Sequence, residues 1–223
     1  MQCAPPSPKS STQLLRNRAQ SATADGSTLV EVFSPCASDG AAVSFALAHI
    51  PITQGKPLLW VQDRISRLES GEPYLPGLPA GLQVICVDVS KPSDLLWTME
   101  EALRCPDLCG VLGEIWGDPP ALDFTASKRL ALRAEAHNVP AWLIRRGGHA
   151  NLSAARQRWR VSSLPAQADP YDPRAPGAPL WQAELFRARW QTPGDWVVSH
   201  DADGLHFDHG VERDLPLEAQ AQI

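Results

Sequence analysis

The sequence predicts an α/β fold: a mostly parallel sheet flanked by helices, followed by a C-terminal antiparallel strand extension. Five short apolar runs alternate with helix-forming stretches, a pattern typical of parallel strands that are buried on both faces. After Gly147 and Gly148 the runs take on alternating polar and apolar character, which favours antiparallel strands.

The parallel part contains five expected strands, at residues 28–34, 58–61, 84–87, 108–115 and 141–144. Three helices are expected between them, at residues 40–50, 92–104 and 124–138. Ser90 or Ser93 is the expected N-cap of the second helix, and Asp123 that of the third. Residues 63–82 are rich in proline and glycine and are expected to form a long loop.

The extension is expected to contain strands at residues 156–161, 180–189, 195–199 and 205–207. Asp203-Gly204, between the last two, is a typical hairpin signal, and residues 166–179 form a proline-rich connection. These elements are expected to make one domain over residues 28–210. Flexible tails are expected at 1–27, with a short helix-forming stretch at 12–20, and at 211–223.

The composition fits a single cytoplasmic domain. The chain has 223 residues, 43% of them hydrophobic, and a formal net charge of −5. It lacks the roughly 18-residue apolar stretch of a membrane span and the apolar segment of a secretory signal, so we expect no membrane partner. Cys36, Cys86, Cys105 and Cys109 are expected to be core residues rather than disulfide partners.

The strand at 28–34 leads through the turn Ser34-Pro35-Cys36-Ala37-Ser38-Asp39-Gly40 into a helix, as in a phosphate-binding P-loop. A working P-loop needs a lysine for the phosphate charge and a serine or threonine for magnesium. The positions just past Ser38 hold neither, and the first lysine after the turn is Lys56. The sequence therefore predicts a nucleotide-binding scaffold without its phosphate-binding residues, which favours an interaction protein over an enzyme.

Six phrases carry a resemblance to known proteins, at residues 31–33, 94–104, 110–114, 122–130, 158–161 and 180–185. In their order and spacing the chain is RecA-like, and it resembles the ImuA family, the damage-inducible mutagenesis factors of bacterial translesion-synthesis cassettes. The likeness spans roughly residues 28–208 and implies a RecA-like domain.

The resemblance assigns roles to single positions. The Walker A place falls on Ser34, Pro35, Ser38, Asp39 and Gly40. Glu114 stands where Walker B has its aspartate, Asp63 about where a carboxylate activates water, and Arg146 where a glutamine senses phosphate. This set weakens ATP hydrolysis without excluding nucleotide binding. Residues 147–154 stand where a DNA-binding loop would be, much shortened.

Asp63 and Glu114 have two interpretations. They would hold magnesium at the carboxyl edge of the sheet, or they are two solvated acids at strand ends. The missing P-loop lysine favours the second, because phosphate charge would remain unneutralised.

A basic stretch is the other candidate site. Between residues 128 and 160 the chain has eight basic residues and one acid, Glu135. The candidate DNA- or partner-binding residues are Arg145, Arg146, Arg156, Arg158 and Arg160. The last three alternate along an expected strand, so we expect them on one face, with Gln157 and Trp159 on the other. The alternative is a solvated or salt-bridged face.

We expect a non-enzymatic accessory protein of SOS-induced, error-prone translesion DNA synthesis, without catalytic residues, metal or cofactor. The resemblance implies three partners: an ImuB-like inactive Y-family polymerase, an error-prone replicative-type polymerase and RecA. Whether DNA is a partner is left open. Two alternatives remain, a residual DNA-stimulated ATPase and a SulA-like inhibitor of cell division.

Overall fold

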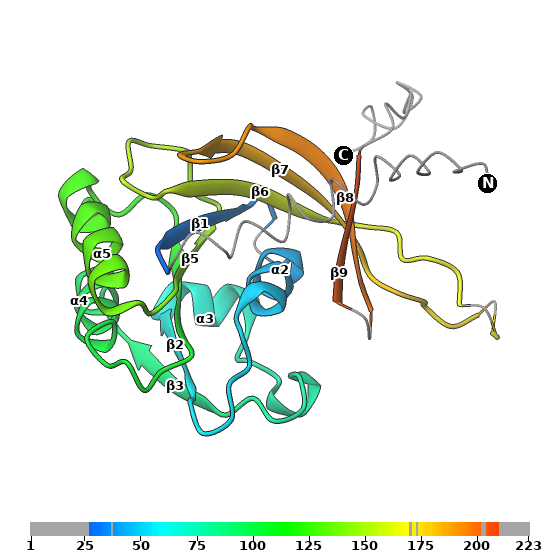
Figure 1. Ribbon diagram of the computed structural model, residues 1–223, viewed down its shortest axis with the longest axis horizontal. Helices are drawn as coiled ribbons and strands as arrows, with labels where there is room; N and C mark the ends of the chain where they lie inside the picture. The colour runs from blue at the N-terminus through cyan, green and yellow to red at the C-terminus, as the bar shows by residue number, and fades with distance from the viewer. Residues whose placement is uncertain (1–26, 37, 170, 173, 202–203, 210–223) are drawn as a thin grey trace, which may run out of the picture.

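The computed structural model describes residues 27–36, 38–169, 171–172, 174–201 and 204–209, so the expected tails lie almost wholly outside these ranges. The described chain forms one nine-stranded sheet, in the order β3-β2-β4-β5-β1-β6-β7-β8-β9 (Figure 1). The β3-to-β6 part is parallel and the β6-to-β9 part is antiparallel. This confirms the predicted α/β class with an antiparallel C-terminal extension. The strand expected at residues 156–161 as the start of that extension is instead parallel to its neighbour β1 and antiparallel to β7.

The parallel strands are β1 (Leu29–Ser34), β2 (Leu58–Asp63), β3 (Val84–Val89), β4 (Gly110–Trp116), β5 (Ala141–Arg146) and β6 (Gln157–Leu164). The antiparallel strands that follow are β7 (Leu180–Ala188), β8 (Gly194–Asp201) and β9 (Gly204–His209). The helices are α2 (Ala41–His49), α3 (Arg64–Ser70), the 3-10 turn η2 (Leu75–Gly77), α4 (Pro92–Ala102) and α5 (Phe124–His137). The hairpin predicted at Asp203-Gly204 is confirmed by the pairing of β8 with β9.

Helices cover both faces of the parallel part. α4 and α5 lie on one face, and α2 lies on the other (Figure 1). Because successive side chains of a strand point to opposite faces, Leu143 packs toward α4 and α5, whereas Ile144 packs toward α2. β1, β2 and β5 are consequently buried along their whole length.

The prediction of a long loop at residues 63–82 is wrong for its first part, where the chain forms the helix α3. The Asp63 carboxylate caps this helix by accepting a hydrogen bond from Ser66 N at 2.7 Å. The N-cap of α4 is Lys91, without a side-chain bond, rather than Ser90 or Ser93. The predicted cap of α5 is confirmed, since Asp123 accepts from Ala126 N at 2.7 Å.

The cysteines correct a second expectation. Only Cys109 of the described cysteines is buried, whereas Cys36, Cys86 and Cys105 are exposed. Cys86 lies on β3, which ends the sheet and has a neighbouring strand on one side only. An apolar run on an edge strand therefore does not imply a buried cysteine.

An aromatic cluster joins the extension to the parallel part. Phe45 of α2 lies 5.1 Å from Trp159 on β6, 6.3 Å from Trp181 on β7 and 6.5 Å from Phe207 on β9, between ring centroids. On the parallel side it lies 6.5 Å from Trp142 on β5. One helix thus packs against both parts of the sheet, which form a single core.

No helix in the described part of the chain combines the length and apolar character needed to cross a lipid bilayer.

The burial of His49 in the aromatic cluster leads us to predict that the folded protein loses stability at acid pH. Desolvation lowers the pKa of His49 to about 4, against a backbone hydrogen bond to Phe45 that raises it. The unfolded chain takes up this proton below about pH 6.5, whereas the folded chain does not until about pH 4. Folding stability should therefore fall as the pH drops through this window.

Because His49 is only half-buried, we expect about 1–2 kcal/mol of lost stability between pH 7.5 and pH 5 from this group. Urea unfolding of the wild type and of His49→Phe at both pH values measures this loss. The free energy of unfolding of the variant should fall less between the two pH values, because the contribution of His49 is missing. The control is His137→Gln, which lies at the end of α5 and outside the cluster. An identical pH dependence in wild type and His49→Phe would contradict the prediction.

Candidate functional site

The carboxyl ends of β1, β4 and β5 meet at one edge of the sheet. Arg146 pairs in register with Ser34 on β1 and with Trp116 on β4. The turn that follows β1 leads into α2, so its residues lie beside these strand ends. The predicted nucleotide-site positions are therefore brought together, as ligand sites are at the carboxyl edge of a parallel sheet.

Glu114 and Arg146 form a buried ion pair at the centre of this edge. Arg146 Nε donates to Glu114 Oε2 at 2.6 Å, and the side chains are 5% and 1% exposed. Glu114 Oε1 accepts from Trp60 Nε1 at 2.7 Å and from Gln62 Nε2 at 2.9 Å. Both oxygens of this carboxylate are engaged, so a magnesium ion would have to displace protein donors.

Asp39 lies at the amino end of α2, where a P-loop protein holds phosphate. Its Oδ1 accepts from Ala41 N at 2.8 Å and from Ser163 Oγ at 2.6 Å, and its Oδ2 accepts from Ser163 N at 2.8 Å. Burial raises the pKa of Asp39, but these hydrogen bonds and the charge of Arg146 hold it below its ordinary value. An ionised carboxylate of the protein thus takes the anion position.

The guanidinium of Arg146, the cation at this site, is also engaged by groups of the protein. Arg146 Nη1 donates to the carbonyl oxygen of Asp39 at 3.3 Å, in addition to its pair with Glu114. Pro35, Ser38 and Gly40 of the turn are exposed, and Ser34 Oγ donates to the carbonyl of Cys36 at 2.6 Å. The Ser34 hydroxyl is therefore engaged within the turn, and the described residues of the turn offer no side-chain cation to a phosphate.

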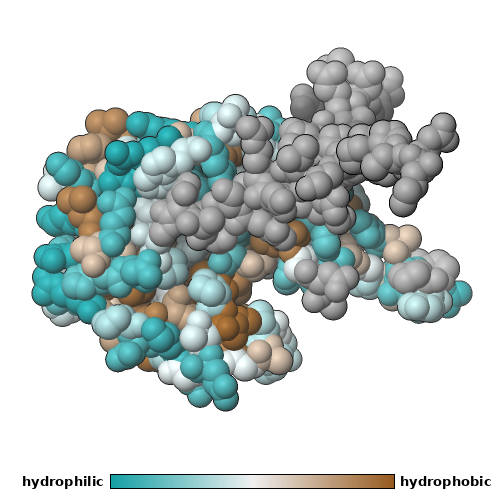
Figure 2. Space-filling model, viewed as in Figure 1, coloured by the Kyte–Doolittle hydropathy of each residue, from teal (hydrophilic) through white to brown (hydrophobic). Residues whose placement is uncertain are grey.

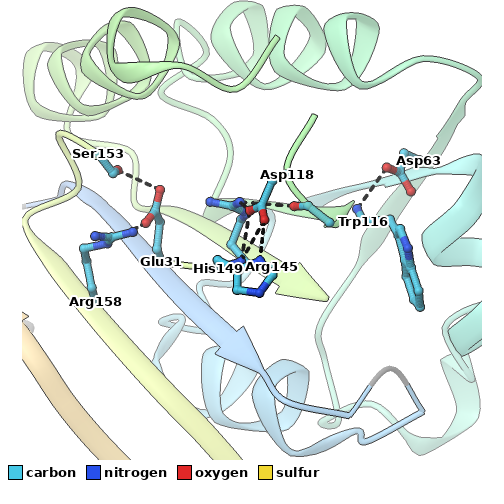
Figure 3. A network of polar contacts seen from close by, with 9 residues as sticks. Glu31, Asp63, Trp116, Asp118, Arg145, His149, Ser153 and Arg158 are labelled. Atoms are coloured by element: carbon cyan, nitrogen blue, oxygen red, sulfur yellow. Dashed lines mark hydrogen bonds and ion pairs between the residues drawn. The ribbon is translucent and has the colours of Figure 1, made fainter. Parts of the chain in front are cut away.

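Asp63 has a structural role. Besides capping α3, its second oxygen accepts from Trp116 N at 3.0 Å, which ties the end of β2 to the end of β4 (Figure 3). The interpretation of Asp63 and Glu114 as solvated acids is wrong, because both are buried. Their neighbours in the fold provide donors that the linear sequence does not reveal.

A groove of about 430 Å³ opens beside this edge, between α2 and the segment that follows α3. Its walls are mostly apolar, with Val43 and Leu47 from α2 and with Tyr74 and Leu78 from the opposite side. Glu114 and Arg146 lie at one end of it. Figure 2 shows apolar surface below α2 in the same region.

A second buried pair joins β1 to β6. Arg158 Nε donates to Glu31 Oε2 at 2.7 Å, and Ser153 Oγ donates to Glu31 Oε1 at 2.7 Å (Figure 3). The Arg158 guanidinium also lies over the rings of Phe33 and Phe186, at 5.2 and 5.3 Å from their centroids. Arg158 therefore stabilises the junction between the parallel and antiparallel strands.

Asp118 connects the two loops that leave β4 and β5. It accepts from Arg145 Nη2 at 2.5 Å and from the backbone N of His149 at 3.0 Å, and it contacts His149 Nδ1 at 2.7 Å (Figure 3). Desolvation raises the pKa of Asp118, whereas the His149 hydrogen bonds and the Arg145 charge lower it, with a net decrease. Burial lowers the pKa of Arg145, opposed by the charges of Glu31 and Asp118.

The arginines of the basic stretch are paired with acids from elsewhere in the fold. All seven arginines between residues 129 and 160 form ion pairs, with Glu31, Glu100, Glu114, Asp118, Glu135 and Glu184. Arg158 and Arg160 do share a face, since both guanidinium groups lie over Phe186. Of the five candidate arginines, only Arg156 and Arg160 extend appreciably into solvent.

Sequence reasoning missed Asp118, His149, Ser163 and the role of Glu31. One signal was present: Glu31 interrupts the apolar run Leu29–Phe33, and an acid in a buried strand requires a partner. The contact of Ser163 with Asp39 spans 124 positions and had no local signal.

Comparison with known proteins gives no further assignment, because no family model matches the chain and no curated protein is significantly similar to it.

The buried pair predicts a large and specific effect on stability. Glu114→Ala leaves Arg146 as an uncompensated buried charge, and we expect a loss of about 3–5 kcal/mol in the free energy of unfolding. Removing both charges, in Glu114→Leu/Arg146→Met, should recover most of that loss. Urea unfolding of Glu114→Leu, Arg146→Met and the double variant measures the coupling between the two charges.

The control is the surface pair of Arg160 and Glu184, whose side chains are 50% and 35% exposed. Glu184→Ala should cost less than about 1 kcal/mol. Equal losses from Glu114→Ala and Glu184→Ala would show that the buried pair has no special role.

Proposed function

We propose that this protein is a non-enzymatic accessory factor of SOS-induced, error-prone translesion DNA synthesis, built on a RecA-like domain that no longer cycles ATP. The fold supports the proposal at a coarse level. A strand, a turn and a helix of P-loop order begin a parallel sheet, and antiparallel strands follow it, as the resemblance to the ImuA family leads us to expect.

The observation that carries the proposal is the charge balance at the carboxyl edge of the sheet. The amino end of α2 binds the carboxylate of Asp39, and Arg146 is neutralised by Glu114. A triphosphate brought to this edge would meet a fixed negative charge and no unpaired cation among the residues described above. Nucleotide hydrolysis depends on neutralising phosphate charge, so this arrangement opposes it.

A scaffold that lacks this chemistry acts through its surfaces. The proposed partners are an ImuB-like inactive Y-family polymerase, an error-prone replicative-type polymerase and RecA. The groove beside α2 is the surface where we expect the ImuB-like polymerase to insert an apolar segment, because its walls are apolar and Tyr74 is exposed at its mouth. Arg156 and Arg160 provide the solvent-facing positive charge for any contact with DNA.

The nucleotide arm of the proposal is tested with the purified full chain. We expect no binding of magnesium-ATP with a Kd below about 1 mM by calorimetry, and no phosphate release with or without single-stranded DNA. Saturable binding in the micromolar range together with steady turnover would contradict the proposal and establish an ATPase.

The partner arm is tested with two tyrosines, the only two in the chain. Both are strongly exposed, but Tyr74 lines the groove and Tyr171 does not. Tyr74→Glu should reduce capture of the ImuB-like polymerase at least about tenfold and should fail to restore damage-induced mutagenesis when expressed in a deletion strain. Tyr171→Glu should capture the polymerase and restore mutagenesis as the wild type does. Equal behaviour of the two variants would remove the groove as the docking surface.

The same strains test the remaining alternative. Overproduction of the wild-type protein in an undamaged culture should leave cell length unchanged. Filamentous cells would favour an inhibitor of cell division.

A further inference from the structure

The sheet has two outer strands, β3 and β9, and their free edges are protected very differently. Unpaired strand edges attract other strands, and proteins usually guard them with charge, proline or a bulge. At the β9 edge, Asp208 is exposed and His206 contacts Asp201 at 2.9 Å. Polar and charged side chains therefore guard that edge.

Among the residues that the structure describes, the β3 edge has no comparable protection. Its sequence, Val84-Ile85-Cys86-Val87-Asp88-Val89, contains no proline, glycine or lysine. Ile85 is 46% exposed and Cys86 is exposed. The one charge, Asp88, is paired with Arg67 Nη1 at 2.7 Å, and Arg67 also pairs with Glu72. An apolar, regular edge strand of this kind is suited to pairing with another strand.

The neighbouring helix α3 has its apolar side chains outward. Ser66 is fully buried, whereas Ile65 and Leu68 are 50% and 71% exposed. Arg67 connects α3 to β3 through its pair with Asp88. A helix normally buries its apolar residues, so this reversed orientation indicates a surface that a partner covers.

We propose that β3 pairs with β3 of a second copy of this chain, antiparallel and around a two-fold axis at Cys86, to join the two sheets into one. This inference is independent of the proposed function.

The register with Cys86 on the axis is self-complementary. It places Ile85 opposite Val87, and Val84 opposite Asp88. The two Asp88 carboxylates then lie about 14 Å apart along the strands, so they do not repel each other strongly. A two-fold interface uses the same patch on both copies, which a mostly apolar strand with one ion-paired charge can satisfy.

The surroundings of β3 also fit a second copy. With the axis perpendicular to the sheet, both α3 helices lie on the same face, one on each side of the seam. A recess of about 660 Å³, lined in part by Arg64, Leu68 and Val89, opens at the carboxyl end of β3. Antiparallel pairing directs the segment preceding the other copy's β3 toward this recess.

The first test measures the mass of the full chain in solution by light scattering. We expect a dimer at about 50 µM, and Ile85→Lys should raise the dimer Kd at least about tenfold by placing charge on the edge. Leu132→Lys, at a similarly exposed position on α5, is the matched control and should leave the dimer unchanged. Circular dichroism confirms that both variants fold. A monomeric wild type, or a dimer that is insensitive to Ile85→Lys, overturns the proposal.

The second test fixes the register with the native cysteine. A variant with Cys3, Cys36 and Cys105 changed to serine retains Cys86 and the buried Cys109. Diamide, which accepts two electrons and two protons from a pair of thiols, should link this variant into a disulfide dimer, because facing residues of antiparallel strands lie about 4.5–5.5 Å apart at Cα. A parallel variant that keeps Cys105 in place of Cys86 should stay unlinked. A dimer broken by Ile85→Lys that forms no Cys86 disulfide overturns the register on Cys86.

Discussion

The buried pair of Glu114 and Arg146 is the constraint on which the carboxyl edge of the sheet depends. It joins β4 to β5, receives donors from Trp60 and Gln62 of β2, and reaches the turn before α2 through the carbonyl of Asp39. Charges removed from water need both a partner and hydrogen bonds for their remaining polar atoms. Four segments distant in sequence meet this need together, so none of these groups is available to a ligand without a cost to the fold.

The same principle governs the rest of the molecule's charge. A stretch that is strongly basic in sequence becomes locally neutral in space, because acids on β1, β4, α4, α5 and β7, and in the loop after β4, pair with its arginines. The guanidinium carbons of Arg158 and Arg145 lie 5.2 and 5.3 Å from the centroid of the Phe33 ring. These arginines therefore contribute to the junction of β1, β5 and β6 before they contribute to any surface.

Much of the fold was predictable, because period and composition report directly on local structure. Five of the six parallel strands, the helices α2, α4 and α5, the cap at Asp123 and the hairpin of β8 and β9 all follow from patterns within a few residues, whereas the parallel pairing of β6 with β1 does not. α3 was missed because its apolar side chains point to solvent and its inward residue is a serine. The exposure of Cys86 was missed because an apolar run does not reveal whether its strand is central or at an edge.

The sequence alone determined that a P-loop-like turn lacks its lysine and its magnesium-binding hydroxyl, since that is a matter of residue type at given positions. Only the tertiary structure decided which groups stand where a P-loop protein would bind phosphate. Asp39 binds the amino end of α2 and is held by Ser163, and Glu114 neutralises Arg146. Residue chemistry is local, whereas the partner of a charge is set by strand order, which brings together positions that are more than a hundred residues apart.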